Sequence, residues 1–185
     1  MPLRDCKKKA AEAFLGFFAM DVLNPPKGSV WGRFNDRTMD PPSIKTLTDK
    51  YKNRLDNCDL DTAMSAAVKA SWVKNLGAVK TSEEVMALSI EELPMLELTP
   101  EGEKAILKEK LWFFSGNHRR TALKIHVDTL TKALEEEGVG AAASQQERNA
   151  LIDAAKMKIE MSSRWAVRIY DRGEWCVSID GKEGS

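Results

Sequence analysis

The sequence has few of the features that mark secreted, zinc-binding or membrane proteins. Its three cysteines, Cys6, Cys58 and Cys176, are far apart and form no CxxC pair. An odd, scattered set of cysteines favours a reducing compartment and indicates neither a disulfide framework nor a zinc site. No apolar run approaches the roughly 20 residues that a membrane-spanning helix needs. We therefore expect an intracellular protein, of the cytoplasm or nucleus, with no membrane partner and no bound metal of its own.

The sequence also lacks a net charge and internal repeats. Its 28 lysines and arginines equal its 28 aspartates and glutamates, so no overall field attracts nucleic acid. Binding of DNA or RNA would need a local basic patch. The length of 185 residues, 43% of them hydrophobic, suffices for one domain with a sizeable core. We predict a single domain over residues 1–185, whose oligomeric state the sequence leaves open.

The N-terminal region combines a basic cluster at residues 7–9 with an apolar stretch at residues 10–20. This order resembles a signal peptide, but Glu12 interrupts the apolar part and no small-residue cleavage site follows. We therefore predict a helix here, within an N-terminal helical extension over residues 1–24. Its expected core-facing stripe consists of Ala10, Phe14, Phe17 and Phe18.

Prolines and helix caps divide the middle of the chain. The pair Pro25 and Pro26 ends the first helix, residues 30–34 are expected to be extended, and Ser43 is the expected cap of a second helix. The loop at residues 35–37 offers arginine either to a phosphate or to nearby aspartates. Residues 59–68 are alanine-rich and predict a short helix, and residues 71–76 predict a strand.

Capping sequences continue after residue 80. Thr81 with Glu84 and Ser89 with Glu92 both fit the capping box, and Thr99 before a proline predicts the start of another helix. That helix leads into residues 111–114, which we expect to be the central strand. Beyond it, the apolar spacing predicts a helix over residues 117–137, a glycine-rich link at 138–143, and a C-terminal helix and hairpin over residues 144–180.

The hairpin carries arginines and tryptophans that permit two interpretations. They could form a nucleic-acid surface on which bases stack, or they could be a packed strand edge kept soluble by its charges. The residues concerned are Arg164, Trp165, Arg168, Arg172 and Trp175.

The turn between the strand at 111–114 and the following helix is the strongest candidate site. Gly116 can take a positive φ, and Ser115 or Asn117 could cap the helix. Side chains in the first turn include those of Arg119 and Arg120, whose forked donors match phosphate oxygens. Such a turn can bind an anion at the helix N-terminus, or it can simply redirect the chain.

Residues 116–122, Gly-Asn-His-Arg-Arg-Thr-Ala, resemble the G-x-H-R-x-x-A signature of the ParB/sulfiredoxin superfamily. Residues 32–37 are loosely similar to that domain's N-x-R segment, so the resemblance covers a core over residues 30–134. It implies a nucleotide phosphate pocket with the glycine, histidine and arginine at its mouth. Asn117 stands where sulfiredoxins have their catalytic cysteine, which argues against sulfinic-acid reductase activity. Asn117 and Thr121 also depart from the motif of the CTP-binding partition proteins.

The resemblance implies a nucleotide, ATP or CTP, bound with Mg²⁺. Gly116 would admit the phosphates, His118 and Arg119 would bind them, Arg120 would assist, and Asn117 would cap the helix or contact the ligand. The implied activity is nucleotide hydrolysis or phosphoryl transfer, which depends mostly on positioning and charge neutralisation. The alternatives are a non-catalytic protein-interaction module and a nucleic-acid-binding domain that uses the same arginines.

The catalytic residues stay unassigned, because no general base follows from the sequence. The carboxylates considered for that role are Asp36, Asp40, Glu101 and Glu103. The expected fold class is α+β, a small mixed sheet surrounded by several helices, with strands near Trp72 and Phe113.

Overall fold

The protein has an α+β fold built on a five-stranded mixed sheet in the order β1-β5-β3-β4-β2. The computed structural model describes residues 3–31, 39–55, 57–77, 79, 81–137 and 145–173. The strands are β1 (Phe14–Asp21), β2 (Ser29–Trp31), β3 (Met64–Val68), β4 (Leu111–Phe113) and β5 (Arg164–Asp171). The pairs β1–β5 and β3–β4 are antiparallel, whereas β5–β3 and β4–β2 are parallel. The outer edge of β1 is covered, because the amides of Phe17 and Ala19 donate to the carbonyls of Val79 and Pro94.

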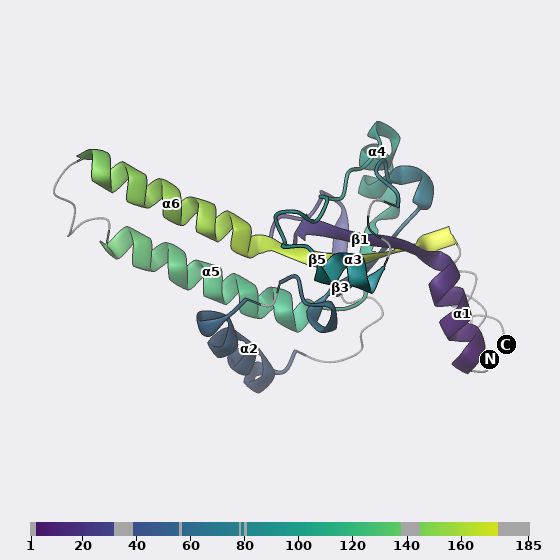
Figure 1. The fold of residues 1–185 in the computed structure, drawn as a ribbon, viewed down its shortest axis with the longest axis horizontal. Helices are drawn as coiled ribbons and strands as arrows, with labels where there is room; N and C mark the ends of the chain where they lie inside the picture. The colour runs from purple at the N-terminus through teal and green to yellow at the C-terminus, as the bar shows by residue number, and fades with distance from the viewer. Residues whose placement is uncertain are drawn as a thin grey trace.

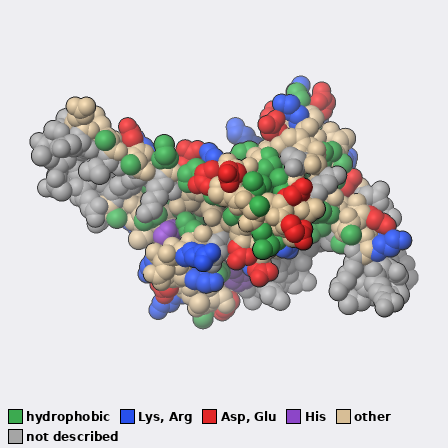
Figure 2. All heavy atoms as spheres, viewed as in Figure 1, with side chains coloured by type: hydrophobic (Ala, Val, Ile, Leu, Met, Phe, Trp, Pro, Cys, Tyr) green, Lys and Arg blue, Asp and Glu red, His purple; other side chains and the backbone are tan. Residues whose placement is uncertain are grey.

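Six α-helices accompany this sheet among the described residues (Figure 1). They are α1 (Leu3–Ala13), α2 (Pro41–Asn53), α3 (Ser82–Met86), α4 (Pro100–Glu109), α5 (Asn117–Glu137) and α6 (Gln145–Ser163). Two short 3₁₀ turns, η1 (Leu60–Thr62) and η2 (Ala70–Trp72), flank β3. Figure 1 shows α5 and α6 running side by side away from the sheet, with α2 beside the first half of α5. The molecule is therefore elongated (Figure 2), with α1 at the opposite end from this helical pair (Figure 1).

Two apolar clusters hold the sheet between its helices. The larger contains Phe18 and Met20 of β1, together with Tyr51 of α2 and Leu123 of α5. The smaller contains Phe17 and Ala19 of β1, with residues of α3 and the following turn such as Val85 and Leu93. Because successive residues of β1 enter different clusters, this strand is buried on both faces.

Several predicted elements are confirmed. The strand β4 and the helix α5 have the expected bounds to within one residue, and β5 covers the first strand of the expected hairpin. The expected central place of β4 is wrong, because β3 is the middle strand and β4 lies between β3 and the edge strand β2. Thr99 caps α4, and Thr81 forms a complete capping box with Glu84 at α3. The α+β class is thus confirmed.

The predicted N-terminal helix is wrong in its second half. Residues Phe14–Asp21 form β1, and only Leu3–Ala13 are helical. A strand buried on both faces presents a continuous apolar run, which periodicity alone does not distinguish from a helix. Gly16, at a φ of +140°, lies at a register shift in the pairing of β1 with β5, and such bulges further obscure the period of two.

The predictions for residues 59–76 are also wrong. The alanine-rich part forms η1 and then β3, and the residues around Trp72 form η2 instead of a strand. Ala66 and Ala67 lie in an interior strand, where tertiary packing overrides the helix propensity of alanine.

One predicted cap differs from the structure. The N-cap of α2 is Asp40 instead of Ser43, because Pro41 and Pro42 occupy the first helical positions, where an amide N–H is not needed. At the second predicted capping box the Ser89 amide donates to the Glu92 carboxylate, and the Leu93 amide donates to the Ser89 carbonyl, so a single short turn forms there. The extended segment at 32–34, the loop at 35–37, the link at 138–143, Ser144 and the second half of the hairpin lie outside the described residues.

Candidate functional site

The turn from β4 into α5 is built on the neighbouring strand β3. The Phe114 amide donates to the Ser65 carbonyl at 3.1 Å, and the Ser65 amide donates to Ser115 Oγ at 2.9 Å. Ser115 therefore extends the pairing of β3 with β4 and is not the cap of α5. The cap position belongs to Gly116, whose carbonyl accepts the Arg120 amide at 2.8 Å, and Asn117 is the first helical residue.

Gly116 has a φ of +94°, a conformation that favours glycine. A Cβ at this position would lie 2.6 Å from Cγ and 2.8 Å from Sδ of Met64, which is fully buried. The glycine is thus required by the backbone conformation and by the packing of β3, before any ligand is considered.

His118 connects the N-terminus of α5 to the N-terminus of α2. Its Nε2 accepts the backbone amide of Asp40 at 3.0 Å. A neutral imidazole that accepts at Nε2 carries its proton at Nδ1. The Asp40 carboxylate accepts from the hydroxyl and amide of Ser43, and these bonds hold the pKa of Asp40 below its usual value.

The two arginines of the motif are held differently. Arg120 Nε donates to the Val22 carbonyl at 3.0 Å, and its guanidinium lies 5.1 Å from the ring centre of Trp31, which stacks on Phe113. Arg120 therefore fixes the chain between β1 and β2 to α5. Arg119 makes a longer bond, 3.2 Å, from its guanidinium to the Asp61 carbonyl at the protein surface.

The structure thus brings the five predicted residues together at one turn, beside the N-terminus of α2. Of the four carboxylates considered as general bases, Asp40 lies at this turn, through its backbone contact with His118. Glu101 and Glu103 lie in the first turn of α4, which packs on η2, and Asp36 lies outside the described residues. Within the described ranges, no group of three His, Cys, Asp or Glu side chains is arranged to hold a metal ion.

The arginines of β5, and Arg172 directly after it, are engaged by the protein itself. Arg168 donates to the Leu60 carbonyl at 2.7 Å, and Arg172 donates to the Glu109 carbonyl and lies over the Trp112 ring. Arg164 forms an ion pair with Glu160, and Trp165 is fully buried. These contacts favour the packed-strand interpretation of this segment, because a buried Trp165 offers no face to a base. Trp175 lies outside the described residues.

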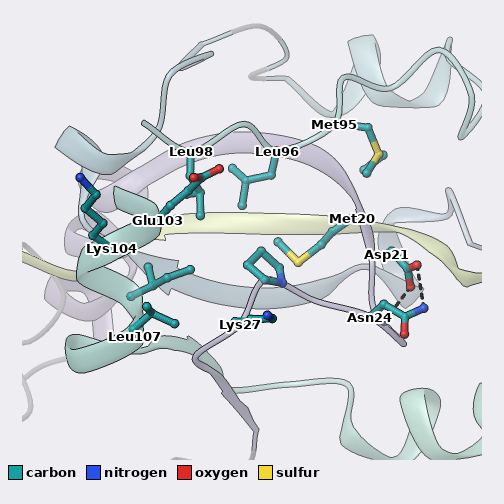
Figure 3. A pocket seen from close by; sticks show the side chains of 13 residues that line it. Met20, Asp21, Asn24, Lys27, Met95, Leu96, Leu98, Glu103, Lys104 and Leu107 are labelled. Carbon is teal, nitrogen blue, oxygen red and sulfur yellow. Dashed lines mark hydrogen bonds between the residues drawn. The ribbon is translucent and has the colours of Figure 1, made fainter. Parts of the chain in front are cut away.

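A second feature, which the sequence did not indicate, is an apolar groove of about 610 Å³ (Figure 3). It lies between the end of β1, the segment at residues 95–98, the turn at residues 24–27 and α4. Its walls contain Met20, Leu96, Leu98, Ile106 and Leu107. The residues come from four separate parts of the chain, so no local sequence pattern predicts the groove.

Comparisons with known proteins identify no relative of this chain. Among the described residues, no helix has the length and apolar character needed to cross a bilayer. No protein-family model matches the sequence, and no curated protein or solved structure is significantly similar to it.

Proposed function

We propose that this chain is a nucleotide phosphate-binding domain resembling the ParB/sulfiredoxin proteins, with the phosphates at the N-terminus of α5. The observation that carries the proposal is the turn at Gly116, which leads into α5 with His118, Arg119 and Arg120 in its first turn. The N-terminus of a long helix favours an anion. The N-terminus of α2 adds no free amide, because its first two residues are prolines and the Ser43 amide bonds to the Asp40 carboxylate. The donor set of His118, Arg119 and Arg120 suits phosphate oxygens.

The contacts give these three side chains different roles. Arg119 is the principal phosphate ligand. Its hydrogen bond to the Asp61 carbonyl is long and lies at the surface, so it can be exchanged for a charge-assisted hydrogen bond to phosphate. His118 contributes its Nδ1–H while Nε2 stays on the Asp40 amide. Arg120 keeps its hydrogen bond to the Val22 carbonyl and holds the turn in place without contacting the phosphates.

Nucleotide hydrolysis or phosphoryl transfer is the reaction class that such a site would serve. In that chemistry the protein mainly positions the phosphates and neutralises their charge, and Mg²⁺ arrives with the nucleotide. The side chains at the turn suit the phosphates, since Arg119 and Arg120 are cationic and His118 offers an N–H donor. We therefore propose that the site binds a nucleotide, with ATP or CTP as the expected ligands. We assign no general base for a reaction.

The test is a thermal-shift panel of ATP, ADP, CTP, GTP and inorganic phosphate, each with and without Mg²⁺. A nucleotide at about 100 times its dissociation constant adds roughly 2.7 kcal/mol to the free energy of unfolding, which a melting curve resolves. We expect a nucleotide-selective rise that Arg119→Ala abolishes. The matched control is Lys124→Ala, an exposed cation on the same helix, which should keep the rise.

Two results would overturn the proposal. One is the absence of any nucleotide-selective rise in the parent protein, and the other is an equal rise in a folded Arg119→Ala variant. If the same arginine instead held a nucleic-acid backbone, affinity for an oligonucleotide would fall steeply with salt, because each neutralised phosphate releases counterions. A pure interaction module would show neither effect.

A further inference from the structure

We propose that the apolar groove beside α4 is a binding site for an uncharged, mainly aliphatic small molecule. The groove is formed by residues outside the motif and does not depend on the phosphate site. Its volume of about 610 Å³ lies within the range of roughly 300–1,000 Å³ that small-molecule sites occupy.

The floor of the groove belongs to the main core of the protein. Met20 and Ile106 are 3% and 2% exposed, and both pack in the larger apolar cluster. In Figure 3, Leu96 and Leu98 extend from their segment toward Met20. The surface under a ligand is therefore apolar and fixed by the packing of the sheet.

The groove is also preformed on the side of the turn at residues 24–27. Gly28, at a φ of +96°, ends this turn, and a Cβ there would overlap the Ile106 carbonyl of α4. The turn is thus seated directly on α4, and the Ser29 amide bonds back to the Pro26 carbonyl at 3.0 Å. A cavity with fixed walls needs little ordering when a ligand binds.

Two large apolar side chains on the lips of the groove are exposed. Met95 is 40% exposed on the segment at 95–98, and Leu107 is 51% exposed on α4. Apolar side chains around a concave apolar surface are typical of ligand sites. The flexible thioether of Met95, on the exposed lip, would adapt to an aliphatic chain lying on the fixed floor.

The charges around the groove determine the class of ligand. The lining contains Asp21 and Glu103 against Lys27 and Lys104, so the charges cancel. The Asp21 carboxylate already accepts the Leu23 amide and both the amide and side chain of Asn24. An ionic head group would find no excess of opposite charge here, and placing it against apolar walls would be costly. A neutral molecule needs no opposite charge and avoids the cost of placing a charge against apolar walls.

The experiment follows the methionine methyl groups by NMR in protein labelled with ¹³C at the methionine ε-position, during titration with 1-octanol. We expect saturable shifts of the Met20 and Met95 signals. Met86 and Met157, which are exposed and do not line the groove, serve as internal controls that should not move. Octanoate and octylammonium, which have the same chain with a charged head, should bind about tenfold more weakly or worse.

Two variants connect the shifts to the groove. Leu107→Glu places a charge on its lip and should weaken octanol binding about tenfold or more, whereas Leu76→Glu, at an exposed leucine outside the groove, should leave it unchanged. Arg119→Ala should also leave it unchanged, so failure of the phosphate site and failure of the groove are separable. Absent or uniform shifts, tighter binding of a charged analogue, or unaltered affinity of Leu107→Glu would each overturn the proposal.

Discussion

Replacing Gly116 with alanine should destabilise the protein even when no ligand is present. The residue has a φ of +94°, which L side chains rarely adopt, and its missing Cβ leaves room for Met64. An added Cβ would lie 2.6 Å from Met64 Cγ, well inside normal contact distance. Met64 is fully buried, so it cannot move away into solvent.

The expected magnitude has two parts. A residue held in an unfavourable backbone region costs of order 1–3 kcal/mol, and overpacking a closed core costs typically 1–3 kcal/mol. The sum, about 2–6 kcal/mol, is a large fraction of the roughly 5–15 kcal/mol by which domains are stable. Gly116→Ala should therefore lower the urea midpoint strongly or prevent folding.

Urea unfolding followed by tryptophan fluorescence measures this loss. The matched control is Gly173→Ala, because the nearest atoms that a Cβ at Gly173 would meet in the described part of the chain are Asp171 Oδ1 at 3.4 Å and Cγ at 4.0 Å, and its φ is not positive. A double-mutant cycle with Met64→Ala separates the two parts, since the shorter side chain removes the contacts with Cγ and Sδ, leaves the Cβ at 3.1 Å and does not change the backbone strain. A loss below about 0.5 kcal/mol in Gly116→Ala, the ordinary scatter of surface substitutions, would refute the reasoning.

Three further predictions concern other parts of the fold. Arg120→Ala should lower the free energy of unfolding by about 1.5–3 kcal/mol in urea titrations, because it removes a charge-assisted bond to the Val22 carbonyl and a cation over Trp31; Lys124→Ala should not. Thr81→Ala should cost about 1 kcal/mol by the same measurement, because it removes the N-cap of α3. Burial, and then the charges of Glu91 and Asp59, raise the pKa of the Cys58 thiol. In a Cys6→Ser, Cys176→Ser background, iodoacetamide should therefore alkylate Cys58 more slowly than a free thiol near neutral pH, and the alkylation rate should reach half its maximum at a higher pH. The Glu91→Gln substitution should raise the alkylation rate near neutral pH, because it removes one of the charges that raise the pKa.

The elements that the sequence predicted correctly are those with local signals. Thr81 and Thr99 cap helices through bonds to residues three positions away, and α5 has an apolar stripe long enough to be recognised. The errors lie in segments whose secondary structure depends on contacts with distant parts of the chain. Phe14–Asp21 forms a strand because β5 pairs with one edge and Val79 and Pro94 bond to the other. No short-range pattern contains that information.

The candidate site shows the same division. The motif identified Gly116 and its neighbours as a turn into a helix, and the structure has that turn. The contact of His118 with Asp40 joins residues 78 positions apart, and the groove beside α4 joins four segments. The first arises because α2 packs against α5, and the second because α4 and residues 95–98 lie beside the end of β1.

The different surroundings of Arg119 and Arg120 decide which substitution can test the phosphate site. In the sequence these two residues are equivalent, since both are arginines in the first turn of a helix after glycine. In the structure Arg120 supports the chain between β1 and β2, so its removal would weaken nucleotide binding simply by loosening the fold. Arg119 holds one surface carbonyl, so its removal should leave the melting temperature of the free protein nearly unchanged. A loss of nucleotide binding in Arg119→Ala at unchanged stability would therefore report on the ligand itself, whereas the same loss in Arg120→Ala would not.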